Sequence, residues 1–329
     1  IPPLTQTFLV TGALGCIGAW AVERLLARGD RPVVFDMGTD PRRIRDLVGE
    51  DGLGGVTFVQ GDIADPDALR ACIEQHGVQR IVHLAGLQVP FCRADPMLGA
   101  RVNVLGTVNV FESAKACGIN RVAYASSAAV YERDDETRAG GAPDEAATPH
   151  PNTHYGVYKL ANEGTARVSY LENGTSSIGL RPLTVYGVGR DQGKTSLPTK
   201  AIKATVVGRE FKIGFGGRTD FLYAKDCAEA FLAAAASGPE GAHVFNLAGD
   251  AVEVTAFADQ LASQAPEAKD LVTVDGPELP VPGAIDGAAL NEVLPGLPHT
   301  SIADGIAETL SRFRALRAAG TLDTSDLDA

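Results

Sequence analysis

The segment TFLVTGALGCIG, residues 7–18, constrains the fold of this 329-residue chain more than any other stretch. An apolar run leads directly into glycines at positions 12, 15 and 18. Glycines at this spacing let the chain turn tightly after a strand, approach a pyrophosphate and begin a helix packed on that strand. The unpaired amides at the start of the helix bind the anion. The pattern predicts a dinucleotide-binding unit, although a strand-to-helix turn without a ligand carries the same glycines.

An acidic residue follows at the distance that such a unit requires. After a helix predicted at residues 19–28, a second apolar run, residues 32–35, ends at Asp36. An acid about 20 residues beyond the glycines binds the hydroxyls of the adenosine ribose. This context favours the dinucleotide interpretation over a simple turn.

Composition and charge exclude several other classes of protein. The chain has 29 Lys and Arg against 41 Asp and Glu, a net charge of -12, which opposes nucleic-acid binding because phosphates are neutralised mainly by Lys and Arg. The longest strongly apolar helix-like stretch, residues 228–236, is too short to cross a bilayer, and residues 1–20 show no signal segment. We therefore expect a cytoplasmic protein without nucleic-acid or membrane partners. Five cysteines without paired spacing predict neither disulfides nor a metal site.

Apolar runs and amphipathic segments alternate after Asp36. Strands are predicted at residues 56–60, 80–85, 122–126 and 177–181, and helices at 66–76, 96–117 and 153–171. This alternation is typical of an α/β protein with a doubly wound parallel sheet, the Rossmann arrangement. We assign residues 4–182 to this dinucleotide-binding domain, with a return to its sheet at 225–247.

Beyond Pro182 glycines are frequent and the predicted elements are shorter. Helices are predicted at residues 197–207, 225–236, 255–264 and 301–317, and a strand at 242–247. We therefore expect a smaller, discontinuous carboxyl-terminal substrate lobe formed by residues 183–224 and 248–320. Residues 321–329 are acidic and lack aromatic side chains, so we expect a disordered tail.

Two strand ends carry residues that suit a cofactor. Asp62 follows the third strand, where its carboxylate accepts a hydrogen bond from the adenine amino group or simply caps a turn or helix. Leu84, Ala85 and Gly86 end the fourth strand, and the small residues there let the cofactor pass close to the chain.

Tyr155 and Lys159 lie four residues apart in a predicted helix, on one face and one turn apart. A phenol with a pKa of about 10 is a poor base at neutral pH, and a nearby ammonium group lowers that pKa. An amphipathic helix with a packed Tyr and a solvated Lys has the same spacing. Two hydroxyls, Ser126 and Ser127, follow the fifth strand, whose carboxyl end faces the crevice where a nicotinamide lies.

The glycine loop, the acid, the strand-end serine and the Tyr-x-x-x-Lys pair, in this order, resemble the extended short-chain dehydrogenase/reductase family, also called the NAD-dependent epimerase/dehydratase family. The resemblance covers nearly the whole chain. It includes HLAG at residues 83–86, NVLGT at 103–107, RP at 181–182, YG at 186–187 and DF at 220–221.

The resemblance implies roles for the matching residues. Tyr155 would be the general acid/base, Lys159 would bind the nicotinamide ribose and lower the pKa of the tyrosine, and Ser127, which fits better than Ser126, would hydrogen-bond the reacting oxygen. Asp36 would bind the ribose diol and repel the extra phosphate of NADP, which favours NAD. The implied cofactor-binding residues are Gly12, Gly15, Cys16, Ile17, Gly18, Asp36, Asp62, Ile63, Leu84, Ala85, Gly86, Asn103, Tyr155, Lys159 and Pro182. For Asn103, a buried polar group satisfied by backbone is an equal alternative.

Departures from the family pattern narrow the reaction. Ala128 and Ala129 stand where dehydrating or decarboxylating members carry acids, so alcohol oxidation, ketone reduction or epimerisation remains. Nucleotide-sugar epimerases usually bind the diphosphate with arginines of the carboxyl-terminal lobe, but residues 271–310 contain no Lys or Arg. Arg218 lies two positions before Asp220, whereas the family pattern places an arginine directly before this acid.

We therefore expect NAD-dependent oxidation of a secondary hydroxyl on a small, non-nucleotide sugar, sugar acid or related alcohol. A nucleotide-sugar 4-epimerase is the alternative, and a non-catalytic NAD-binding redox sensor is a third, which the complete Ser, Tyr and Lys set disfavours. The expected substrate residues are Gln88, Ser127, Tyr186 and Arg218. The resemblance also implies a homodimer through helices 96–117 and 153–171. Arg42 and Arg43 lie close enough to Asp36 in sequence to weaken the preference for NAD, although a solvated helix face is the usual role of such residues.

Overall fold

A seven-stranded parallel sheet is the central element of the protein. The structure, a computed structural model, describes residues 5–131 and 141–328. The strands of this sheet are β1 (Thr7–Thr11), β2 (Arg31–Asp36), β3 (Thr57–Gln60), β4 (Arg80–His83), β5 (Arg121–Ala125), β6 (Ser176–Pro182) and β10 (Ala242–Leu247). Their order is β10-β6-β5-β4-β1-β2-β3, and it reverses between β1 and β4, the switch point of a doubly wound sheet. The predicted α/β fold with a Rossmann sheet is confirmed.

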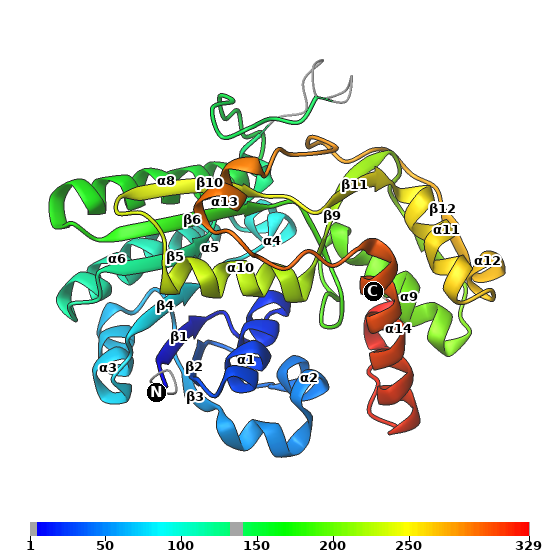
Figure 1. Cartoon of the computed structure of the whole chain (residues 1–329), viewed down its shortest axis with the longest axis horizontal. Coiled ribbons are helices and arrows are strands. Elements are labelled where there is room, and N and C mark those ends of the chain that lie inside the picture. Colours follow the sequence, from blue (N-terminus) through cyan, green and yellow to red (C-terminus); the bar gives the residue numbers. More distant parts are fainter. Residues whose placement is uncertain (1–4, 132–140, 329) are drawn as a thin grey trace.

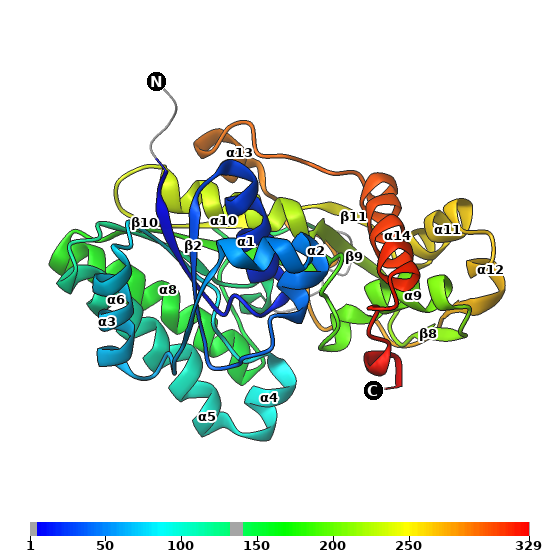
Figure 2. The same cartoon turned by 90° about the horizontal axis from the view of Figure 1, so that it is seen from below.

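Helices cover both faces of the sheet. On one side lie α1 (Cys16–Arg28) and α10 (Ala224–Ala236), and on the other α3 (Pro66–His76), α6 (Gly106–Ala116) and α8 (His154–Asn173) (Figure 2). Side chains of the strands alternate between the two cores: Val10 and Val34 pack with α1 and α10, whereas Leu9 and Val33 pack with α3 and α6. Because both faces are buried, the strands are continuous apolar runs in the sequence.

The carboxyl-terminal part adds two small sheets and further helices beside the main sheet (Figure 1). A three-stranded sheet has the order β11-β9-β7, and a two-stranded sheet pairs β12 with β8. These elements are β7 (Thr184–Tyr186), α9 (Leu197–Val207), β8 (Phe211–Ile213), β9 (Arg218–Tyr223), β11 (Asp250–Glu253), α11 (Val254–Gln264), α12 (Ala268–Leu271), β12 (Val272–Val274), α13 (Ala288–Val293) and α14 (Ile302–Ala318).

The chain passes between the main sheet and this part three times, and one core spans both. β6 leads into β7, β9 continues directly into α10, and β10 is followed by β11. Trp20 of α1 packs edge-on against Tyr223 of β9, with ring centroids 5.7 Å apart. The aromatic core continues to Phe221 and Phe257, whose rings stack at 4.5 Å.

The shorter elements connect the main ones and lie mostly near the edge where the parallel strands end. They are α2 (Arg42–Gly52), α4 (Val89–Ala94), α5 (Pro96–Ala100), a π-helical turn η2 (Arg101–Leu105), and the 3-10 turns η1 (Leu53–Gly55), η3 (Ala128–Val130), η4 (Lys194–Ser196) and η5 (Ser325–Asp328). No helix in the described part of the chain is both long and apolar enough to cross a membrane.

The expectation of a disordered tail is wrong for residues 321–328; residue 329 lies outside the described residues. Asp326 pairs with Lys203 of α9 at 2.7 Å, and both side chains are at most one-tenth exposed. Asp323 pairs with Arg42 of α2, and Leu327 is buried. The acidic residues that suggested solvation in the sequence meet basic partners from distant segments, which no local pattern reveals.

Candidate functional site

The glycine loop between β1 and α1 is shaped to hold a dinucleotide. Gly12 has φ +68°, and a Cβ there would lie 2.6 Å from the backbone nitrogen of Ala85. A Cβ on Gly18 would lie 2.5 Å from the Cα of Ala13. Only glycine permits this approach of the loop to β4 and to its own helix. No described side chain caps α1, so its first amides are open to an anion.

A cavity of about 660 Å³ runs along this loop and the carboxyl ends of the strands. Its volume is within the roughly 300–1,000 Å³ of ligand pockets. The expected cofactor residues that line it are Gly12, Gly15, Cys16, Ile17, Gly18, Asp36, Ile63, Leu84, Ala85, Gly86, Tyr155, Lys159 and Pro182. Arg42, Arg43, Arg190 and Gln192 also line it, and the motifs had not indicated them. The residues present therefore fit a dinucleotide.

Asp36 is fixed at the adenosine end of this cofactor cavity. Its carboxylate accepts hydrogen bonds from the amides of Leu14 and Gly38, both at 3.0 Å. These bonds hold the side chain at the end of β2, and the carboxylate keeps further acceptor sites for ribose hydroxyls.

Two of the expected cofactor residues do not line the cavity. Asp62 accepts a hydrogen bond from the amide of Ala64 at 2.9 Å and pairs with Arg101 at 2.6 Å, so it serves as a turn residue. Asn103, in the π-helical turn η2, bonds both the amide and the carbonyl of Leu87, at 2.7 and 2.9 Å. Asn103 is therefore a buried polar residue whose side chain is satisfied by backbone groups, as in the alternative interpretation. Its hydrogen bonds fix the loop that follows β4.

Tyr155 lies in the first turn of α8, directly beside the serine loop. The Thr153 hydroxyl caps the helix by accepting a hydrogen bond from the amide of Gly156 at 3.0 Å. A Cβ on Gly156 would lie only 2.3 Å from the carbonyl oxygen of Ala129. Gly156 therefore lets the start of α8 approach the loop that carries Ser127, and Ser127 and Tyr155 line the same second cavity.

Lys159 is buried one turn further along α8. Its Nζ donates to the carbonyl oxygen of Ala125 at 2.7 Å and lies 5.5 Å from the centroid of the Tyr155 ring. Burial lowers the pKa of Lys159 to about 8. The side chain reaches the cofactor cavity at the nicotinamide end, next to Gly86.

The pKa of Tyr155 differs from the expectation, because burial raises it above the ordinary value. The Ser127 hydroxyl and the Arg190 guanidinium lower it in part. Lys159 directs its charge to Ala125, so the cation that counteracts burial most directly is Arg190, which lines both cavities.

The second cavity, also about 660 Å³, is basic on a protein of strongly acidic composition. Arg93, Arg190 and Lys194 line it, whereas no Asp or Glu is among its described lining residues. Arg93 and Lys194 take part in no ion pair within residues 5–131 and 141–328, and the Nε of Arg190 is buried without a partner there. Apolar side chains form another part of the lining, namely Val89, Pro90, Leu183, Leu279, Pro280 and Val281, and the neutral polar residues Asn152, Thr153 and Thr195 also contribute.

Two of the four expected substrate residues lie outside this cavity. Gln88 and Ser127 line it. Tyr186 is fully buried in the aromatic core, 5.3 Å from Phe257, because β7 turns its side chain inward. Arg218 is exposed at the far end of β9, where it donates to the carbonyl of Ala251. Both assignments are corrected, and the cations of the cavity come from α4, from the segment after β7 and from η4.

The comparisons with known proteins agree with this geometry. The sequence model of the NAD-dependent epimerase/dehydratase family matches residues 8–248. The chain belongs to this family. Members of the family are NAD-dependent, so the expected cofactor and the expected class of enzyme are confirmed.

Relatives of this family member include UDP-glucose 4-epimerases. That of Mycolicibacterium smegmatis is 31% identical over 326 residues, 93% of this chain and 98% of the relative. Among solved structures, MoeE5 in complex with UDP-glucuronic acid and NAD is 26% identical, with a TM-score of 0.76 over 94% of this chain and 99% of its own. A partial consensus L-threonine 3-dehydrogenase, 20% identical with a TM-score of 0.80, shares the fold (94% and 99% covered).

Proposed function

We propose that this protein is an NAD-dependent enzyme that oxidises a secondary hydroxyl of an anionic carbohydrate, and that nucleotide-sugar 4-epimerisation is its reaction. One observation carries the proposal: Ser127 and Tyr155 share a cavity with three cations, and none of its described lining residues is acidic. In a protein of net charge -12, such a site attracts an anion.

The residues of the chain divide the chemistry as follows. Ser127 hydrogen-bonds the reacting oxygen, and Tyr155 takes its proton as general base. Lys159 and Asp36 hold the two riboses of NAD, which accepts the hydride when bound. In an epimerase, Tyr155 returns the proton after the sugar has presented its other face. Arg190, between the two cavities, favours the ionised phenol.

The preference for a nucleotide sugar rests on size, charge and relatives. Residues 271–310 lack Lys and Arg, which argued against a diphosphate unless Arg190, Lys194 or Arg218 reached it; Arg190 and Lys194 line the cavity together with Arg93, whereas Arg218 does not. Two negative charges and a nucleoside suit a basic cavity of about 660 Å³ with apolar walls better than a lone free sugar. The relatives include UDP-glucose 4-epimerases. A sugar-acid dehydrogenase is the second candidate. The single carboxylate of a sugar acid needs fewer cations than a diphosphate does, and Arg218 lies outside the cavity.

The same proposal covers the organisation of the chain. Residues 4–182 and 225–247 bind the cofactor, and residues 183–224 and 248–320 form the substrate lobe, with the enzyme in the cytoplasm.

We also propose a homodimer through the helices at residues 96–117 and 153–171. Exposed apolar side chains on η2 and α8 support it, since Leu105 is 45% and Val157 is 47% exposed.

The test is a substrate panel with two readouts. Purified protein and NAD are incubated with neutral sugars, free sugar acids, UDP-glucose and UDP-glucuronic acid, and both NADH absorbance and product identity are followed. Product change without net NADH establishes the epimerase, and net NADH with a sugar acid establishes the second candidate. Turnover only of neutral sugars would refute an anionic substrate. The variant Lys194→Ala should raise KM for the anionic substrate about tenfold, because it removes one charge-assisted contact.

A further inference from the structure

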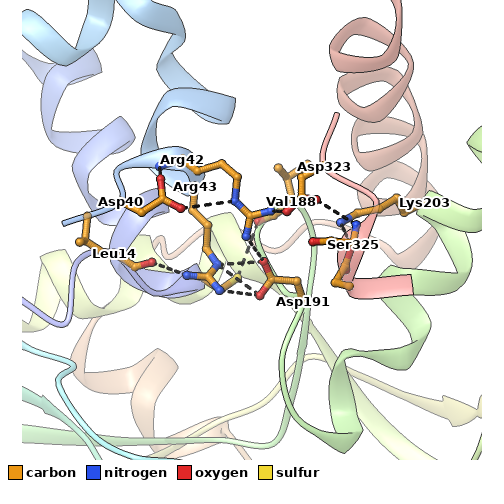
Figure 3. A network of polar contacts seen from close by, with 11 residues as sticks. Leu14, Asp40, Arg42, Arg43, Val188, Asp191, Lys203, Asp323 and Ser325 are labelled. Atoms are coloured by element: carbon orange, nitrogen blue, oxygen red, sulfur yellow. Dashed lines mark hydrogen bonds and ion pairs between the residues drawn. The ribbon is translucent and has the colours of Figure 1, made fainter. Parts of the chain in front are cut away.

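Two arginines next to the adenosine end of the cofactor cavity are held by an acid of the substrate lobe. Arg42 and Arg43 begin α2, six and seven residues after Asp36, and both line the cofactor cavity. Both point to Asp191, which is 9% exposed and follows Arg190 in the loop between β7 and η4 (Figure 3).

The contacts around Asp191 are bidentate and short. Arg43 donates through Nε and one terminal nitrogen, at 3.1 and 2.7 Å, and through its other terminal nitrogen to the carbonyl of Leu14 at 2.7 Å. Arg42 donates to Asp191 at 3.1 Å and pairs with Asp323 of the carboxyl-terminal segment. The two guanidinium groups therefore lie on a substrate-lobe carboxylate, and the solvated helix face expected for them is wrong.

This arrangement affects the choice of cofactor. An arginine near the acid at the end of the second strand accommodates the 2′-phosphate of NADP in dinucleotide-binding folds. Here two arginines line the cavity near Asp36, but the guanidinium groups of both donate to Asp191. Asp191 is not among the described lining residues of the cavity. Asp191 and, for Arg42, Asp323 neutralise the charge that would bind a phosphate, and they occupy donors of both guanidinium groups.

We propose that Asp191 is a specificity-determining residue for NAD over NADP, acting through Arg42 and Arg43. Asp36 repels the 2′-phosphate from the cavity side, and Asp191 withholds the arginines that would bind it. Cofactor choice is therefore set in part by the substrate lobe, in the loop that also carries Arg190 and Lys194 toward the substrate cavity. The inference does not depend on which sugar is the substrate.

The experiment is calorimetric titration of the full chain with NAD and with NADP, and the readout is the ratio of the two dissociation constants. Asp191→Asn keeps the size of the side chain and removes the negative charge that pairs with both guanidinium groups. Arg42 keeps its pair with Asp323, so mainly the charge of Arg43 becomes available. The ratio should then move about fivefold to tenfold toward NADP, the value of one charge-assisted phosphate contact. Glu50→Gln is the matched control, since this exposed acid of α2 lies outside the cavity and its removal changes net charge equally.

A third variant distinguishes the arginine mechanism from simple loss of charge. Adding Arg42→Gln and Arg43→Gln to Asp191→Asn should abolish the gain in NADP affinity. A ratio that stays at the wild-type value in Asp191→Asn, an equal loss of affinity for both cofactors, or a gain that persists without the arginines would each overturn the proposal.

Discussion

Lys159 is expected to cost the folded protein stability while it serves the cofactor, and Lys159→Met should make the cofactor-free protein more stable at pH 7. Burial lowers the pKa of this lysine from 10.5 to about 8, and that shift of about 2.5 units corresponds to about 3.4 kcal/mol at 1.36 kcal/mol per unit. Methionine removes this penalty but leaves the carbonyl of Ala125 without its donor, at a cost of about 1–3 kcal/mol. The expected net gain in free energy of unfolding is therefore between about 0.4 and about 2.4 kcal/mol.

The sign of the pH dependence follows from proton binding. Between pH 8 and 10.5 the unfolded chain keeps the lysine proton and the folded protein has lost it, so the stability of the wild type rises with pH there. The variant lacks this rise. Its advantage should therefore be complete below pH 8 and should disappear by about pH 10.

The assay is urea unfolding of wild type and variant at pH 7 and pH 9.5 without NAD. Lys115→Met, at a half-exposed lysine of α6, is the control and should show no pH-dependent difference. Two results would contradict a destabilising buried lysine: a lower free energy of unfolding for Lys159→Met than for the wild type at pH 7, or the same difference in free energy of unfolding at both pH values.

Three further predictions concern the acid/base residue, the carboxyl-terminal segment and the helix face. Tyr155→Phe should reduce turnover about 100-fold or more with nearly unchanged NAD affinity, measured by steady-state kinetics and calorimetry; more than a tenth of wild-type turnover would point to another base. Asp326→Ala leaves the buried charge of Lys203 unpaired and should destabilise the protein by about 3 kcal/mol in urea unfolding, whereas Asp326→Asn should cost less. Leu105→Lys should convert a dimer to a monomer in light scattering after size-exclusion chromatography, and an unchanged mass would exclude this interface.

Regular elements with strong periodicity could be predicted almost to the residue. The predicted helix at 197–207 and strand at 242–247 have the bounds of α9 and β10. α9 is an 11-residue helix that ends before a glycine, and β10 is a short strand whose last three residues are buried beside β6. The glycine loop could also be predicted, because its backbone geometry requires glycine at positions 12 and 18.

The site was less predictable where contacts come from distant loops. Tyr186 matches a family motif, yet β7 directs it into the aromatic core. Arg190 and Lys194 reach the second cavity from the segment between β7 and the start of η4, which has no periodic pattern, and Asp191 between them faces the opposite way, toward α2. Alternation of direction in such a loop depends on tertiary packing, which a one-dimensional pattern does not contain.

Because the chain passes three times between the main sheet and the carboxyl-terminal part, this part, the proposed substrate lobe, cannot be separated from the main sheet. An excised lobe would lose the core that Trp20 and Tyr223 share, and its removal would cut the chain between β6 and β10, two paired strands of the main sheet. We therefore expect limited proteolysis to release no stable lobe. For evolution and for engineering, this means that new substrates are acquired by substitutions within loops such as 187–196 and not by exchange of a modular cassette.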